Sequence, residues 1–307
     1  MGSHGGGGCD QHAHRAVVDR FLPRPHDRDH GDGTALHRRR SGGGSSMSRL
    51  TIEDLSVEVA ATRSSILRGV DLEIEPGEIV GLVGESGSGK SMTSLATMGI
   101  LPFGLRQTSG RFLVDGEDVT DQKRRSVSSR FAMIFQNPRD SLNPLMKVGE
   151  QVARMVQLHQ RLGRAESRAE AVRLLGRVHI IAPDETARKY PHQLSGGMCQ
   201  RVMVAMALAC KPSLLIADEP TTALDVTVQA QILDLIIELT DETRCGVLLV
   251  THDLGVVAET CDRVNVLYRG DLVESGTTAR VFADPQHEYT RYLLDAGRQL
   301  EAADGAA

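Results

Sequence analysis

A glycine-rich segment at residues 84–91 has the residue types and spacing of a phosphate-binding loop. It reads Gly-Glu-Ser-Gly-Ser-Gly-Lys-Ser and fits the pattern G-x-x-x-x-G-K-[ST]. Glycines let consecutive backbone N–H groups converge on phosphate oxygens, and the positive end of a following helix adds to the attraction. In such a loop we expect Lys90 to reach the β- and γ-phosphates of a nucleotide and Ser91 to ligate Mg²⁺. The predicted nucleotide-binding residues are Gly84, Glu85, Ser86, Gly87, Ser88, Gly89, Lys90, Ser91 and Met92.

Two adjacent acids, Asp218 and Glu219, follow the apolar run 214–217. In ATPases with a phosphate loop, the first acid of such a pair lies near Mg²⁺ and the second acts as general base on the attacking water. Two acids alone are more often a solvated turn. Here the buried strand delivers them to the same sheet edge as the phosphate loop. We therefore predict Asp218 as a metal ligand and Glu219 as the catalytic base.

The elements that must position these residues alternate between strands and helices. The run 79–83, Ile-Val-Gly-Leu-Val, shows no apolar–polar alternation, as is typical of a strand covered on both faces. Similar runs at 214–217 and 247–250 are separated by an Ile- and Leu-rich helix at about 228–239. This order predicts a parallel sheet with right-handed crossovers.

Two other segments show different patterns. Apolar residues nearly alternate from Leu50 to Ile74, which predicts short antiparallel strands before the Pro76-Gly77 turn. Helical spacing then dominates from about Pro144 to Ala209. The sequence thus predicts an α/β core that carries an antiparallel β subdomain and an inserted helical subdomain at about 138–210.

Composition excludes several classes of protein. The chain has 307 residues and a net charge of −5, which gives no sign of a nucleic-acid partner. Aromatic residues make up only 3%, which argues against sugar-stacking clefts and platforms for single-stranded nucleic acid. No stretch approaches 18 uncharged apolar residues, so we expect no membrane span. The five cysteines lack C-x-x-C spacing and are expected to be reduced thiols: Cys9, Cys199, Cys210, Cys245 and Cys261.

The first 46 residues differ in composition from the rest of the chain. They hold six of the eleven histidines and ten of the 31 glycines, with no apolar periodicity. We predict a disordered Gly/His/Arg-rich extension at 1–46, a nucleotide-binding domain at 47–300 and a tail at 301–307. The favoured interpretation of the extension is upstream sequence before a start at Met47. The alternative is a Ni²⁺-binding segment that uses His12-x-His14.

Further motifs resemble the ATP-binding-cassette (ABC) family. Residues 194–198, Leu-Ser-Gly-Gly-Met, with Gln200-Arg201 resemble its signature sequence, and residues 218–225 resemble its Walker B and D-loop. Gln136 resembles the Q-loop glutamine, and Thr251-His252-Asp253 resembles the segment of the switch histidine. All motifs occur in the family order across about residues 50–290. The resemblance implies a P-loop cassette with a RecA-like core that hydrolyses ATP with Mg²⁺.

The resemblance also implies roles for residues that would be ambiguous alone. A lone Ser-Gly-Gly is more often a plain helix cap, and Gln136 and His252 could be ordinary residues at strand ends. In the family, the signature closes on the γ-phosphate of ATP bound to a partner subunit. The residues expected to contact that ATP in trans are Ser195, Gly196, Gly197 and Asp225. The expected catalytic residues are Glu219, His252 and Gln136, and the expected Mg²⁺ ligands are Ser91, Gln136 and Asp218.

Residues 135–144, Phe-Gln-Asn-Pro-Arg-Asp-Ser-Leu-Asn-Pro, resemble the Q-loop of the peptide/nickel importer group. Residues 190–198 and the segment His287-Glu288-Tyr289-Thr290 resemble that group too. The resemblance implies a peripheral ATPase on the cytoplasmic face of a bacterial cell membrane. Its implied partners are a second ATPase subunit in a head-to-tail dimer, identical or paralogous, two membrane permeases and an extracytoplasmic substrate-binding protein.

The transported solute is less well defined. Residues 99–110 and 203–209 are most similar to the nickel-import branch, and no cysteine cluster of the peptide branch follows Cys261. We therefore expect nickel uptake, with di- or oligopeptide import as the alternative. A soluble cassette ATPase of DNA repair or translation is a more distant alternative.

One departure from the family pattern concerns adenine. Members place an aromatic ring ahead of the phosphate loop to stack on the base, but this sequence has none between Phe21 and Phe103. We expect aliphatic side chains such as Val59 or Ile66 to contact the base, with weak selectivity between bases.

Overall fold

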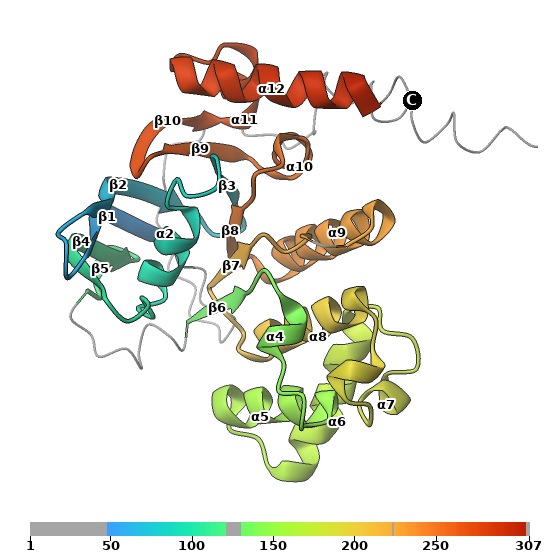
Figure 1. Cartoon of the computed structure of the whole chain (residues 1–307). Helices are drawn as coiled ribbons and strands as arrows, with labels where there is room; N and C mark the ends of the chain where they lie inside the picture. The colour runs from blue at the N-terminus through green and yellow to red at the C-terminus, as the bar shows by residue number, and fades with distance from the viewer. Residues whose placement is uncertain (1–47, 121–129, 223, 305–307) are drawn as a thin grey trace, which may run out of the picture.

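The computed structural model describes residues 48–120, 130–222 and 224–304, with side chains described up to residue 297. The predicted extension at 1–46 lies outside the described residues. Two sheets, the helices that connect and follow their strands, and a separate group of helices make up the described part (Figure 1). One sheet has six strands in the order β10-β9-β3-β8-β7-β6, and the other has four in the order β2-β1-β4-β5.

The six-stranded sheet is the predicted parallel core. Every residue of the neighbouring strands β3, β8 and β7 is buried, because helices or the second sheet cover both faces. Strand β3 pairs in parallel with β8 and β9, and β7 pairs in parallel with β6 and β8, whereas β10 is antiparallel to β9. The strands are β3 (Ile79–Val83), β6 (Phe131–Ile134), β7 (Leu214–Asp218), β8 (Gly246–Val250), β9 (Arg263–Tyr268) and β10 (Asp271–Thr277).

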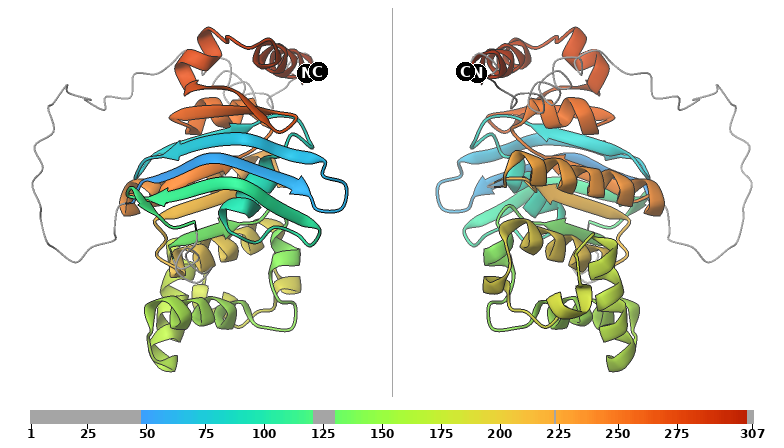
Figure 2. Two further views of the ribbon diagram at one scale, coloured as in Figure 1. Left: turned by 90° about the vertical axis from the view of Figure 1, so that its left-hand side faces the viewer. Right: turned by 90° about the vertical axis from the view of Figure 1, so that its right-hand side faces the viewer.

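The four-stranded sheet is the predicted antiparallel subdomain. Its strands are β1 (Leu50–Val59), β2 (Ser65–Ile74), β4 (Leu105–Val114) and β5 (Glu117–Asp118). Apolar side chains such as Ile52 and Leu72 pack in one cluster with Leu82, Ile216 and Leu248 of the six-stranded sheet. Figure 2 shows the two sheets lying face to face. Helix α2 (Lys90–Thr97) contributes Ala96 to the same cluster.

The helical insertion lies between β6 and β7 and forms a separate lobe (Figures 1 and 2). It consists of α4 (Pro138–Ser141), α5 (Val148–Gln160), α6 (Arg164–Arg177), α7 (Pro183–Thr186), the 3-10 helix η2 (Pro191–Gln193) and α8 (Gly196–Ala209). Val152, Leu174 and Val202, one from each long helix, are buried in its core. The predicted α/β class with these two additions is therefore confirmed.

The remaining helices connect and follow the core strands. They are α9 (Val226–Thr243), α10 (Leu254–Thr260), α11 (Thr278–Ala283) and α12 (Glu288–Asp304). Helix α12 continues past residue 300, so the start of the predicted tail falls inside a helix; the other domain boundaries stay predictions. Among the described residues, no helix is both long and apolar enough to span a bilayer.

The four cysteines within the described residues are free and buried in the core. Burial raises the pKa of the Cys210 thiol to about 11 and the pKa values of Cys245 and Cys261 to about 12. Since the thiolate is the nucleophile, these groups are unreactive at neutral pH.

We therefore expect iodoacetamide at about pH 8 to leave Cys245 and Cys261 unmodified in the folded protein, whereas urea-unfolded protein is fully alkylated. Peptide mass spectrometry measures the modified fraction at each cysteine. Equal modification of Cys245 or Cys261 in the two samples would contradict this packing.

Candidate nucleotide site

The phosphate loop joins β3 to α2 at the carboxyl edge of the six-stranded sheet. Three of its glycines have a positive φ: 151° at Gly84, 83° at Gly87 and 112° at Gly89. L-residues with a side chain rarely adopt such values. A Cβ at Gly84 would also overlap the carbonyl oxygen of Leu267. The glycines at these positions are therefore required by the path of the chain.

The loop presents groups that fit a phosphate. The Lys90 side chain is buried and its Nζ donates to the carbonyl oxygens of Gly84 (2.7 Å) and Glu85 (3.0 Å). Burial lowers the pKa of Lys90, although nearby carboxylates oppose the shift. Ser88 is also buried, and its Oγ has no hydrogen-bond partner among the described residues. A buried polar atom without a partner, in the same loop as a buried ammonium, is the arrangement that a bound anion would complete.

Asp218 and Ser91 meet beside this loop. The Ser91 hydroxyl donates to Asp218 Oδ1 at 3.3 Å. Burial raises the pKa of Asp218, and the adjacent charge of Glu219 adds to this, whereas Ser91 and Lys90 lower it. A hydroxyl and a carboxylate oxygen are ligands that Mg²⁺ accepts, usually together with substrate phosphates and water. The described residues contain no group of three or more His, Cys, Asp or Glu side chains that could hold a metal ion.

Glu219 lies at the centre of the candidate catalytic residues. Its Oε2 accepts hydrogen bonds from Gln136 Nε2 at 2.8 Å and from Thr222 Oγ1 at 2.9 Å. Its Oε1 lies 3.1 Å from Nδ1 of His252. The structure therefore brings together the three predicted catalytic residues. Gln136 donates through Nε2 to the carboxylate of Glu219, and its further role as a metal ligand stays a prediction.

These contacts keep Glu219 ionised. Burial raises the pKa of its carboxyl, but the hydrogen bonds from His252 and Thr222, together with the charges of His252 and Lys90, hold the pKa below its ordinary value. A base must be deprotonated at the working pH, and this shift meets that requirement, although a lower pKa also makes the carboxylate a weaker proton acceptor. Glu219 also has a φ of 46°, a left-handed conformation that is rare for residues with a side chain and frequent at functional sites.

The sheet explains how residues so distant in sequence meet. Gln136 follows β6, Glu219 follows β7, and His252 follows β8. The strands β6, β7 and β8 are parallel neighbours, so their carboxyl ends lie at one edge. In the register, Asp218 pairs with Val250, two residues before His252.

The residues predicted to contact ATP in trans have local roles in this chain. Ser195 caps α8 by accepting a hydrogen bond from the amide of Met198 at 3.3 Å. Asp225 caps α9 by accepting one from the amide of Val228 at 3.0 Å. A Cβ at Gly197 would lie 2.6 Å from Cγ1 of Val228, so this glycine lets α8 approach α9 closely. In the described residues none is hydrogen-bonded to the phosphate loop of its own chain, and their role in trans stays a prediction.

Two contacts of the site were not predicted from the sequence. Thr222 lies inside the D-loop motif, but nothing in that pattern indicates that its hydroxyl bonds to Glu219. Tyr289 of α12 accepts a hydrogen bond from the backbone N–H of Glu85 at 2.9 Å.

Of the two expected adenine contacts, Ile66 lies beside the loop, with its carbonyl oxygen 3.5 Å from the position of a Cβ at Gly89. The contact of either residue with adenine stays a prediction.

Two ATP-binding proteins of transporters are similar to this chain in sequence. The probable peptide ABC transporter ATP-binding protein y4tR of Sinorhizobium fredii is 47% identical over 256 residues, which cover 80% of this chain and 76% of that protein. The glutathione import ATP-binding protein GsiA of Escherichia coli is 48% identical over 268 residues, which cover 83% of this chain. The match spans only 43% of the length of GsiA.

Solved structures share the fold. The cbiO1 protein from Clostridium perfringens, described as part of the ABC transporter complex cbiONQ, has a TM-score of 0.67 and 27% identity, covering 83% of this chain and 98% of its own. The ATP-binding cassette MJ0796 was solved as a dimer in a post-hydrolysis state with ADP and Pi. It has a TM-score of 0.66 and 28% identity, and the match covers 75% of this chain and 98% of MJ0796. The predicted P-loop cassette fold is confirmed by these neighbours.

The family model described as ABC transporter matches residues 67–222, which contain the phosphate loop, the signature and the acids Asp218 and Glu219. The prediction of an ABC-type ATPase cassette is therefore confirmed at the level of the family. From its motifs, its fold and its relatives, this chain belongs to the ABC transporter family as an ATP-binding protein.

Proposed function

We propose that this chain is the ATP-hydrolysing subunit of a peptide importer. The observation that carries the hydrolytic part is the carboxylate of Glu219, which Gln136, Thr222 and His252 hold beside the phosphate loop. Three side chains from loops after three different strands fix this one group. Such an arrangement orients a base far better than an exposed acid could be oriented.

Each residue then has a defined task. Lys90 and the loop amides bind the phosphates of ATP, and Ser88 supplies a hydroxyl that otherwise lacks a partner. Ser91 and Asp218 would hold Mg²⁺, which neutralises phosphate charge when bound. Glu219 accepts a proton from the attacking water, and His252 and Gln136 orient the carboxylate.

We further propose that the signature acts across a dimer. Ser195, Gly196, Gly197 and Asp225 would face the nucleotide of a second subunit, either a copy or a paralogue. The dimeric form in which MJ0796 was solved supports this arrangement for a related cassette. Two permeases and a substrate-binding protein complete the proposed importer, with this chain bound peripherally at the cytoplasmic face of the membrane.

The names of the relatives favour peptide over nickel as the solute. The y4tR protein is named as a probable peptide transporter component and GsiA as a glutathione importer. The expectation of nickel uptake, which depended on short resemblances at 99–110 and 203–209, gains no support from these names. We therefore propose a di- or oligopeptide, with nickel as the competing outcome of the test below.

The first prediction concerns Thr222. Replacing Thr222→Val keeps the shape of the side chain and removes its hydrogen bond to the carboxylate. Because hydrogen bonds to charged groups contribute about 1.5 kcal/mol or more, we expect kcat for ATP hydrolysis to fall about tenfold with little change in KM. The rate of phosphate release by the purified protein at several ATP concentrations gives both kcat and KM.

The matched control is Thr260→Val at the end of α10, which removes a hydroxyl that contacts the carbonyl of Val256 and the thiol of Cys261. We expect the control to retain its turnover. Equal loss in both variants would show that Thr222 acts on the fold and not on the base.

The second prediction concerns the solute. A strain that lacks this chain should lose uptake of labelled peptides such as glutathione or a dipeptide, while uptake of labelled Ni²⁺ is unchanged. Complementation with the wild-type chain should restore the peptide uptake. Loss of Ni²⁺ uptake alone would favour the nickel alternative and contradict the proposal.

A further inference from the structure

We propose that Tyr289, on the C-terminal helix α12, positions the phosphate loop and thereby sets the affinity of this chain for nucleotide. The inference rests on the proposed nucleotide site and adds a residue that lies outside its motifs. Tyr289 belongs to the segment His287-Glu288-Tyr289-Thr290, which is far from the phosphate loop in sequence and lies beside it in the fold.

The contact joins two segments that lie far apart in the sequence. The Tyr289 hydroxyl accepts a hydrogen bond from the backbone N–H of Glu85 at 2.9 Å, across 204 positions of sequence. The Tyr289 side chain is only 7% exposed, so its hydroxyl reaches the loop from inside the protein. Burial raises the pKa of Tyr289, which keeps the phenol neutral.

The same peptide group is held from its other side by Lys90. The carbonyl of Gly84 and the N–H of Glu85 belong to one peptide unit, and Lys90 Nζ donates to that carbonyl at 2.7 Å. The peptide is therefore fixed between an ammonium and a phenol. When Lys90 turns toward a phosphate, Tyr289 is the partner that can still hold the orientation of this peptide.

The position of Tyr289 is itself well defined. Its ring stacks on that of Tyr268 at the end of β9, with centroids 4.1 Å apart. The guanidinium of Arg269 lies 5.0 Å from the centroid of the Tyr268 ring, on its face. Aromatic stacking of this kind restricts where the hydroxyl of Tyr289 can lie.

A buried acid anchors the chain just before α12. Glu274 of β10 accepts hydrogen bonds from the backbone N–H groups of Gln286 (2.8 Å) and His287 (3.0 Å). Burial raises the pKa of Glu274, but these amides, together with Arg280, hold it below its ordinary value. The ionised carboxylate thus fixes the segment that leads into Tyr289.

The turn between β9 and β10 holds the loop at a second point. The N–H of Gly270 donates to the carbonyl of Ser88 at 2.8 Å. The segment from β9 to α12 therefore contacts the loop at two points, Glu85 and Ser88, and Tyr289 makes the contact that comes from α12. Since binding couplings are reciprocal, nucleotide binding should also restrain α12.

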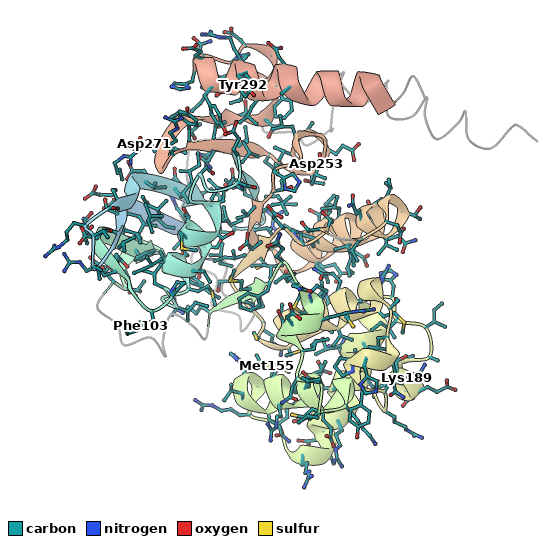
Figure 3. All side chains as sticks on the ribbon, viewed as in Figure 1. Phe103, Met155, Lys189, Asp253, Asp271 and Tyr292 are labelled. Carbon is teal, nitrogen blue, oxygen red and sulfur yellow. The ribbon has the colours of Figure 1, made fainter. Side chains whose placement is uncertain are left out.

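The test replaces Tyr289→Phe, which keeps the stacked ring and removes only the hydroxyl. The control is Tyr292→Phe on the same helix, because Tyr292 is 61% exposed. Figure 3 shows the position of Tyr292 on α12. Full-length purified proteins are compared by equilibrium binding of MgATP, by hydrogen exchange of the peptide that contains Glu85, and by Tm.

We expect Tyr289→Phe to weaken MgATP binding about fivefold, the usual effect of one neutral hydrogen bond, and to speed exchange of the loop amides. Its Tm and the kcat for hydrolysis should stay close to wild type, with the loss confined to Kd and KM. Tyr292→Phe should leave all of these values unchanged.

Two results would overturn the inference: unchanged loop exchange in Tyr289→Phe, or faster exchange with an unchanged Kd. A wild-type chain that binds no MgATP would instead contradict the proposed nucleotide site. Exchange in the absence of nucleotide would still report whether Tyr289 holds the loop.

Discussion

The carboxylate of Glu219 and the hydrogen bonds that hold it link most of the described site. Gln136, Thr222 and His252 each reach this group from a different loop, and the backbone adopts a left-handed conformation at that residue. A conformation of this kind persists only where the surroundings stabilise it. The buried ends of the parallel strands supply that support.

Geometry of the sheet determines which loops can meet there. β8 lies between β3 and β7, and β6 lies beyond β7, so the phosphate loop, the two acids and the switch histidine leave the sheet at one edge. The antiparallel sheet and the C-terminal segment pack against the same loop from other directions, as contacts at Gly89 and Glu85 show. The helical lobe connects to this edge through Gln136, which follows β6, whereas the segment after α8 enters β7 at its amino end, on the opposite edge of the sheet.

Much of this arrangement could be predicted from the sequence. The glycines of the loop, the acids after β7 and the buried strand runs each follow from local chemistry, and the structure brings Gln136, Glu219 and His252 within hydrogen-bonding distance. The contacts of Thr222 and Tyr289 could not be predicted, because they depend on how a D-loop and a C-terminal helix pack in three dimensions. The order of strands in the sheet, and the roles proposed for Ser195 and Asp225 toward a second subunit, are likewise not contained in local periodicity.

The most direct measurement of the central claim is the ATP turnover of Glu219→Gln, with Glu117→Gln, on the exposed edge strand β5, as control. If Glu219 is the base, turnover should fall by about a hundredfold or more while MgATP binding is retained, and the control should hydrolyse ATP at the wild-type rate. Turnover of Glu219→Gln within a few-fold of wild type would contradict the account.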